Sequence, residues 1–203
     1  MIICVTGPMA AGKNAVASVL KESGWLSVDA DDLVHEAVGH TTPQILAAFS
    51  PAAEKAGVML VKDDGSLDRR ALGSLIFGDT ELLAKQESIV YPEVNRLTEE
   101  FIGANAGRNI ALNATVLYKI PCLMEKCSAV LYVTAPYLKR FFRAKARDGL
   151  PCRQIAARFR SQRELYPNYV KTGIPVMLIH NTGSLPALRR KTETVIKQIV
   201  KNT

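Results

Sequence analysis

Residues 1–14 read "MIICVTGPMAAGKN", an apolar run followed directly by a glycine-rich turn. The run "IICVT", residues 2–6, has the composition of a buried strand. After the turn, "AVASVLKES", residues 15–23, places Val16, Val19 and Leu20 at helical spacing. A buried strand, a glycine-rich turn and a helix in this order predict a loop whose backbone amides bind phosphate.

The rest of the chain alternates apolar strand patterns with helical patterns. We expect further strands at residues 25–30, 109–115, 129–135 and 175–181. Helices are expected from Thr41, as a capping residue before Pro43, and within residues 63–77, 81–90, 92–102, 136–165 and 185–200. Strands that alternate with helices predict an α/β fold of three layers, in which helices cover a mainly parallel sheet.

Composition narrows the class of protein. The chain has 203 residues, of which 48% are hydrophobic and 22% charged, as in an ordinary soluble domain. Its net charge of +7 suits polyanionic partners. The four cysteines are scattered, so neither a zinc site nor a disulfide framework is indicated. No apolar stretch suits a signal peptide or a membrane span, and we expect a cytoplasmic protein.

Residues 7–14, "GPMAAGKN", satisfy seven of the eight positions of the pattern Gly-x-x-x-x-Gly-Lys-Ser/Thr. In such a loop the lysine, here Lys13, reaches the β- and γ-phosphates of a nucleotide. Asn14 stands where a hydroxyl normally holds Mg²⁺. Because an amide oxygen is also a hard neutral ligand, we expect a weakened metal site at Asn14. The predicted nucleotide-binding residues are Gly7, Pro8, Met9, Ala10, Ala11, Gly12, Lys13, Asn14 and Ala15.

A pair of acids follows the second predicted strand in "VDADD", residues 28–32. Asp29 and Asp31 flank Ala30, so on an extended segment both carboxylates would point to the same side. A carboxylate at the carboxyl end of a strand can accept a proton from a substrate hydroxyl. The alternative is that these are solvated acids, or that Asp31 or Asp32 caps a helix.

The segment 138–164 is strongly basic. Arg140, Arg143 and Arg147 recur at helical spacing and can share one face of a helix. Asp148 is the only acid between Lys139 and Arg163. Such unbalanced guanidinium groups suit a lid that closes on a triphosphate, with nucleic-acid binding as the competing use.

Taken together, these segments resemble the dephospho-CoA kinase family. Besides the phosphate-binding turn, the similar stretches are "VDADDLVHEAV" (28–38), "DGSLDRRALGSLIFGD" (64–79), "IVYPEV" (89–94), "RDGLPCRQIAARFRSQ" (147–162) and "LIHNTGS" (178–184). They keep their order from residue 2 to about residue 184, which is far more specific than a phosphate-binding turn alone.

The resemblance implies a P-loop kinase fold that transfers the γ-phosphate of ATP, with Mg²⁺, to the ribose 3′-hydroxyl of dephospho-CoA. This is the last step of coenzyme A biosynthesis. It also implies a five-stranded parallel core within one domain, together with a helical CoA-binding subdomain and a lid. Their approximate ranges are 1–32, 103–135 and 170–203 for the core, 33–102 for the subdomain and 136–169 for the lid.

The resemblance further implies roles for single residues. Asp31 becomes the catalytic base and Lys13 the γ-phosphate clamp, while Arg140 or Arg143 acts with Arg147 in the lid. Residues implied on the acceptor side are Asp29, Asp31, Arg69 and Tyr91, and those near the adenine of ATP are Asn181 and Gly183. ATP and dephospho-CoA are the implied partners, and neither nucleic acid nor a membrane is expected.

The chain departs from the family pattern in three further places. Tyr91 replaces a histidine before Pro92, and a phenol carries no positive charge near neutral pH. "NATVLYKIP", residues 113–121, stands in place of Pro-Leu-Leu-x-Glu, and "GIPVML", residues 173–178, lacks the usual Ala-Asp. Two alternatives therefore stay open: a kinase for another nucleoside or nucleotide, and a nucleic-acid binder or catalytically weakened relative. Asp31 argues against a mere binder, which needs no base.

Overall fold

A computed structural model describes residues 1–202 of the chain. The chain forms two compact units. The first contains Met1–Ala30 and Ala104–Thr203, and the second contains Asp31–Gly103.

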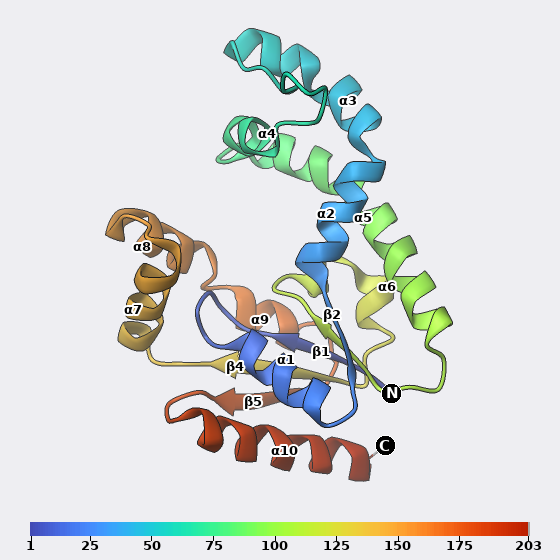
Figure 1. The fold of residues 1–203 in the computed structure, drawn as a ribbon, viewed down its shortest axis with the longest axis vertical. Coiled ribbons are helices and arrows are strands. Elements are labelled where there is room, and N and C mark those ends of the chain that lie inside the picture. The colour runs from blue at the N-terminus through green and yellow to red at the C-terminus, as the bar shows by residue number, and fades with distance from the viewer. Residues whose placement is uncertain (203) are drawn as a thin grey trace. The chain divides into compact units, whose positions relative to one another are not determined.

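The first unit is built on a sheet of five parallel strands in the order β2-β3-β1-β4-β5 (Figure 1). The strands are β1 (Ile2–Thr6), β2 (Leu26–Asp29), β3 (Ile110–Asn113), β4 (Ala129–Thr134) and β5 (Val176–His180). The predicted five-stranded parallel sheet is therefore confirmed. Because β1 is central, the glycine-rich turn that follows it lies between the carboxyl ends of β3 and β4, where ligands gather in open α/β sheets.

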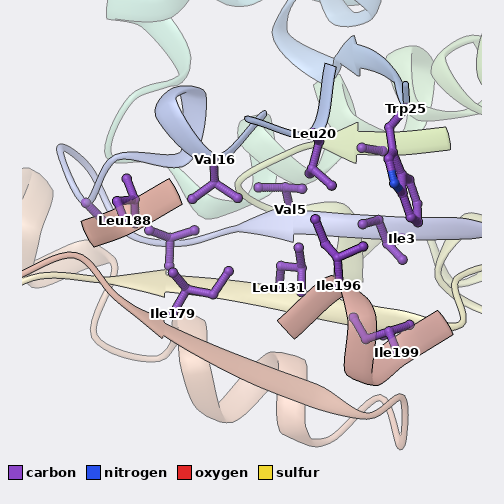
Figure 2. Packing of buried hydrophobic residues seen from close by; sticks show 14 residues of the cluster. Ile3, Val5, Val16, Leu20, Trp25, Leu131, Ile179, Leu188, Ile196 and Ile199 are labelled. Atoms are coloured by element: carbon purple, nitrogen blue, oxygen red, sulfur yellow. The ribbon is translucent and has the colours of Figure 1, made fainter. Parts of the chain in front are cut away.

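Helices α1 (Lys13–Glu22) and α10 (Leu185–Asn202) pack on one face of this sheet. Figure 2 shows Val16 and Leu20 of α1 in one buried cluster with Ile3 and Val5 of β1. Alternate strand residues point to the other face, where Tyr169 of α9 (Leu165–Val170) is fully buried beside Cys4. The unit also contains a 3₁₀ turn, η1 (Leu117–Lys119), and α6 (Pro121–Met124).

Between β4 and α9 the chain forms a helical hairpin, α7 (Tyr137–Asp148) and α8 (Cys152–Ser161), which we call the lid hairpin. Gly149 ends α7 in the left-handed conformation, with φ of 64°. A small cluster of Ala144, Ile155 and Phe159 holds the two helices together. The predicted basic helical pair is thus confirmed.

The second unit is helical. Its helices are α2 (Ala30–His40), α3 (Thr42–Ala56), α4 (Arg69–Ile76) and α5 (Thr80–Ala104). One expectation is wrong here, and another is confirmed only in part. Pro92 lies inside one continuous α5 and does not separate two helices. Thr41 is the N-cap residue of α3, but its side chain makes no capping hydrogen bond, because its hydroxyl donates to the carbonyl of Ala37 at 2.7 Å.

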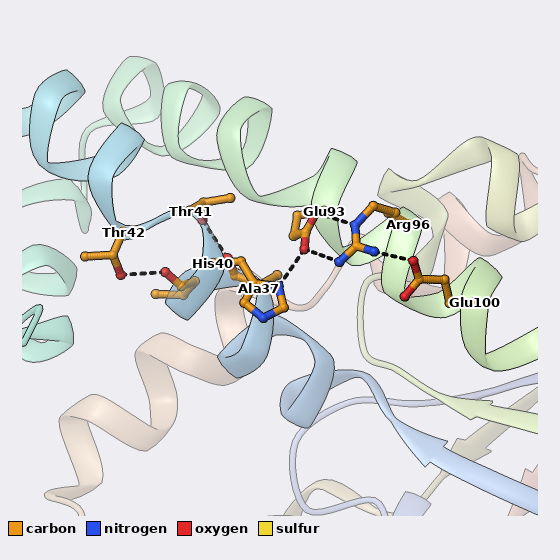
Figure 3. A network of polar contacts seen from close by, with 8 residues as sticks. Ala37, His40, Thr41, Thr42, Glu93, Arg96 and Glu100 are labelled. Atoms are coloured by element: carbon orange, nitrogen blue, oxygen red, sulfur yellow. Dashed lines mark hydrogen bonds and ion pairs between the residues drawn. The ribbon is translucent and has the colours of Figure 1, made fainter.

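A polar network joins α2 to α5 within this unit (Figure 3). Glu93 accepts from Arg96 Nη2 and from His40 Nδ1, both at 2.6 Å, and Arg96 also contacts Glu100. The hydrogen bond from Arg96, followed by that from His40, lowers the pKa of Glu93 from 4.5 to about 2. The carboxylate is therefore favoured in the folded state.

We expect Glu93→Gln to lower the free energy of unfolding at neutral pH but not at strongly acidic pH. A lowered folded-state pKa adds stability above the unfolded value near 4.5, and this stability is lost as the pH falls towards 2. Urea unfolding followed by circular dichroism at several pH values would measure the difference in the free energy of unfolding between variant and parent, called the gap below. Glu54→Gln, at an exposed carboxylate of α3 with no ion pair within residues 1–202, is the control. A gap that stays constant down to pH 2 would contradict this account.

Candidate functional site

The turn after β1, residues 7–14, is called the phosphate loop below. Gly7 and Gly12 have φ of 150° and 106°, and Ala10 takes the left-handed value of 61°. The N–H of Ala11 donates to the carbonyl of Pro8 at 3.0 Å, which closes the turn. Helix α1 begins at Lys13, so its first N–H groups, which lack intrahelical partners, open onto the loop. This geometry suits phosphate oxygens.

Both loop glycines are required by space as well as by φ. A Cβ on Gly7 would lie 2.1 Å from the backbone oxygen of Val133, and one on Gly12 would lie 2.3 Å from Nδ2 of Asn181. Asn181 is buried, and its Nδ2 donates to the carbonyl of Ala11 at 2.8 Å. The sequence-predicted Asn181 therefore supports the phosphate loop directly.

Lys13 donates to the hydroxyl of Thr115, just beyond the end of β3. The carbonyl of Thr115 accepts from Thr6 Oγ1 at 3.1 Å and from the phenol of Tyr169 at 3.2 Å. Burial raises the pKa of Tyr169, so the phenol stays a donor. The bonds from Thr6 and Tyr169 hold the backbone of Thr115 in place, so its hydroxyl lies where it can accept a hydrogen bond from Lys13. Sequence reasoning missed Thr115 and Tyr169.

Asn113, the last residue of β3, bridges two predicted site residues. Its Nδ2 lies 2.8 Å from Oδ2 of Asp29 and 3.2 Å from Oδ1 of Asn14. Its own Oδ1 is buried and has no hydrogen-bond partner among the described residues. The structure thus brings together Asn14 and Asp29, through a third residue that was not predicted. Amide and carboxylate oxygens form the hard donor set that Mg²⁺ prefers.

The expected extended geometry of Asp29 and Asp31 is wrong. β2 ends at Asp29 and α2 begins at Ala30, so Asp31 and Asp32 lie in the first turn of a helix. The two carboxylates therefore do not share one side of a strand. Acidic residues in a first helical turn are stabilised by the helix dipole.

The three lid arginines differ in their surroundings. Arg140 Nε donates to the carbonyl of Met9 at 2.9 Å, and Arg147 Nε pairs with Asp148 at 2.6 Å. Arg140 Nη2 and Arg143 Nη1 are both buried without a hydrogen-bond partner among the described residues. Arg143 differs from Arg140 in that it forms no other hydrogen bond or ion pair with the residues that the structure describes. A buried guanidinium nitrogen without a partner is costly, so an anion beside either arginine would be stabilising, and Arg143 is the one whose other nitrogens also have no partner within residues 1–202.

Arg69 and Tyr91 both belong to the second unit. Arg69 Nη2 donates to the carbonyl of His35 at 3.1 Å, and the phenol of Tyr91 donates to Glu87 at 3.1 Å. Arg69 lines a cavity of about 750 Å³, whereas Tyr91 does not. The cavity is lined by Gly39, Thr42, Lys62, Ser66, Leu67, Asp68, Arg69 and Arg70.

The charge of this cavity favours an anionic ligand. It has three cationic side chains and one acid, Asp68, which caps α4 by accepting from the N–H groups of Arg70 and Ala71 at 2.9 Å. The bond from Ala71, and then that from Arg70, lowers the pKa of Asp68. Because Asp68 is occupied by the helix terminus, Lys62, Arg69 and Arg70 carry the electrostatic character of the cavity.

Within residues 1–202, no three His, Cys, Asp or Glu side chains cluster in a way that could hold a metal ion. No described helix combines the length and apolar character needed to cross a membrane.

Comparisons with known proteins agree on one family. A family model described as dephospho-CoA kinase matches residues 1–186. Dephospho-CoA kinase from Treponema denticola is 33% identical, over 98% of this chain and 90% of that protein. A crystal structure of a Thermus thermophilus protein is 32% identical, with a TM-score of 0.79 over 98% of this chain and 97% of that one. Dephospho-CoA kinase from Campylobacter jejuni, at 23% identity, shares the fold, with a TM-score of 0.62 over 98% and 96% of the two chains.

Proposed function

The chain belongs to the dephospho-CoA kinase family, and on that premise we propose how its own residues carry out the reaction. It is an ATP-dependent kinase with a P-loop fold that converts dephospho-CoA to coenzyme A. The observation that carries the proposal is the phosphate loop, with Lys13 held by Thr115 at the carboxyl end of β1.

On the donor side, the loop N–H groups and the start of α1 bind the phosphates of ATP. Lys13 contacts the β- and γ-phosphates and offsets the negative charge that develops as the bond to the γ-phosphate breaks. Thr115, fixed by Thr6 and Tyr169, keeps the ammonium group of Lys13 aimed in one direction.

On the acceptor side, Asp31 is the general base. The ribose 3′-hydroxyl of dephospho-CoA attacks the γ-phosphorus, its proton passes to the Asp31 carboxylate, and ADP leaves. Support comes from the place of Asp31, two residues beyond the carboxyl end of β2, in the first turn of α2. The cationic cavity around Arg69 and Arg70 is suited to the phosphate groups of the acceptor.

In the lid hairpin, Arg143 is the arginine that we assign to the transferred phosphate. Arg143 Nη1 and Arg140 Nη2 are both buried without a partner among the described residues, but Arg140 also donates from Nε to the carbonyl of Met9. Arg147 is paired with Asp148, so Arg143 is the lid arginine with no hydrogen bond or ion pair within residues 1–202 that competes for its guanidinium. An arginine that meets the γ-phosphate neutralises charge in the transition state.

Mg²⁺ would be held by Asn14 and, directly or through water, by Asp29. The amide and carboxylate oxygens beside Asn113 suit this ion, and the buried Oδ1 of Asn113 can accept a hydrogen bond from a water molecule of its hydration shell. When bound, Mg²⁺ neutralises charge on the β- and γ-phosphates. Asn113 fixes the Asn14 side chain by donating to its oxygen.

We expect Asn14→Ser to lower the Mg²⁺ concentration needed for half-maximal turnover by about threefold to tenfold. The amide oxygen of Asn14 already accepts a hydrogen bond from Asn113, whereas a serine hydroxyl would be closer in size to the ligand that such loops normally use. Initial rates measured over a range of Mg²⁺ concentrations would give the concentration for half-maximal turnover. Asn14→Ala, which removes the ligand, should raise this concentration. An unchanged Mg²⁺ requirement in Asn14→Ser would refute the weakened site.

The function is tested by ATP-dependent formation of coenzyme A from dephospho-CoA and Mg²⁺, followed by chromatography. Adenosine and AMP serve as competing acceptors, and the expected result is phosphorylation of dephospho-CoA in strong preference to both. Folded protein that binds ATP but phosphorylates only another nucleoside or nucleotide would overturn the proposed acceptor. Binding to nucleic acid that weakens steeply with added salt would support the alternative class.

A further inference from the structure

We propose that Gln162 and Arg140 are positioning residues. They hold the phosphate loop in its ATP-binding conformation by forming hydrogen bonds to the N–H and the carbonyl of Met9. Oε1 of Gln162 accepts from the N–H of Met9 at 2.7 Å, and Nε of Arg140 donates to the carbonyl of Met9 at 2.9 Å. Both backbone groups of one loop residue are therefore occupied by the lid region. The proposal rests on the proposed function, since it assigns how the ATP site of that kinase is kept in shape.

The two side chains that bind Met9 come from a packed part of the chain, and one of them has a further contact. The guanidinium of Arg140 lies over the ring of Phe159, 4.1 Å from its centroid. Phe159 is buried against Ala144 and Ile155 in the cluster that joins α7 to α8. Gln162 directly follows α8. The lid hairpin thus presents one donor and one acceptor on a packed framework, which limits the entropy lost in forming both bonds.

Apolar contacts reinforce these hydrogen bonds. The side chains of Met9 and Ala10 pack against the same lid cluster. Ala10 has φ of 61°, a conformation that costs energy for any residue with a Cβ. A strained residue persists only where its surroundings enforce it, and here the bonds to Met9 and the lid cluster provide that enforcement.

This arrangement predicts a specific kinetic signature. The phosphate loop binds ATP before and during the reaction alike, so a loosened loop should weaken ATP binding more than it slows phosphoryl transfer. Dephospho-CoA is recognised elsewhere, and its KM should not change. If the residue served only to stabilise the fold, its substitution would instead lower the melting temperature and would not raise KM for ATP more than KM for dephospho-CoA.

The test compares Gln162→Met, which removes the acceptor, with Gln154→Met on the exposed face of α8. Calorimetric titration with MgATP, without acceptor, should give a dissociation constant raised about fivefold to tenfold for Gln162→Met, as expected for one lost hydrogen bond. Gln154→Met should bind as the parent does. KM for ATP should rise in parallel while kcat falls less than about twofold.

Arg140→Lys keeps the charge but loses the Nε donor, and the double variant tests whether both residues act on one peptide. Their effects on the MgATP dissociation constant should combine non-additively, because both act through Met9. Unchanged MgATP affinity in folded Gln162→Met, or an equal rise in KM for dephospho-CoA, would overturn the proposal. If the protein binds MgATP but makes no coenzyme A, the proposed function is wrong, whereas the MgATP titration still tests the roles of Gln162 and Arg140.

Discussion

Asp31→Asn is expected to lower kcat for coenzyme A formation by about 10²-fold to 10⁴-fold, the usual contribution of a general base. The amide has the shape of the carboxylate but cannot accept the proton of the ribose hydroxyl. ATP binding depends on the phosphate loop and Lys13, which the substitution leaves intact. Steady-state rates and MgATP titration of the same preparation would therefore separate chemistry from binding.

Asp32→Asn is the matched control, because Asp32 is an exposed acid in the same first turn of α2. It should retain activity within about threefold, since it loses only a favourable contact with the helix dipole. If Asp31→Asn keeps more than about a tenth of the parent rate, Asp31 is not the base. Loss of activity in Asp32→Asn alone would move that role to its neighbour.

The parts of the fold that could be predicted are those encoded by local patterns. Apolar runs such as residues 2–6 located the strands, and the phosphate loop was recognised because its glycines and lysine lie within eight residues. The spacing of Arg140, Arg143 and Arg147 likewise indicated one helix of the lid hairpin. Each of these signals depends on neighbours in the sequence, which is what periodicity can detect.

The parts that could not be predicted depend on tertiary neighbours. Asn113, Thr115 and Gln162 are single polar residues at the ends of elements, and nothing in their own segments marks them as contacts of the phosphate loop. They were missed because the topology that brings β3 and α8 to the loop is not visible in local sequence. A polar residue at the carboxyl end of a strand next to β1 was the one available signal.

Two errors show how local rules can be overridden. Pro92 was expected to break a helix, yet α5 continues through it, and buried Val90 and Val94 on either side anchor that helix in the second unit. The apolar pattern predicts that the second strand extends to Ala30, whereas α2 begins there, and the acids after it favour the start of a helix. Tertiary packing therefore outweighs the local rule at Pro92, and the helix dipole favours a helix start at Ala30.

The other large effect expected is on stability, from Gly7→Ala. The new methyl group would sit 2.1 Å from the backbone oxygen of Val133 on β4, and φ of 150° is one that residues with a Cβ avoid. A backbone oxygen within a sheet cannot move aside as a side chain can. We expect a loss of roughly 3 kcal/mol or more in the free energy of unfolding, from strain and overpacking together. For a chain of this size, the melting temperature should fall by about 10 °C.

Gly24→Ala separates strain from collision. Gly24 has φ of 86°, but a Cβ there would meet nothing within 4 Å, so only the backbone strain remains. Its loss should be about 1–2 kcal/mol. Gly12→Ala is intermediate: the colliding atom belongs to the Asn181 side chain, which can rotate away at the cost of its bond to Ala11. Gly12→Ala should therefore keep more stability than Gly7→Ala but lose MgATP affinity. Thermal unfolding of the three variants checks this order, and equal losses in Gly7→Ala and Gly24→Ala would contradict the close packing of the phosphate loop on β4.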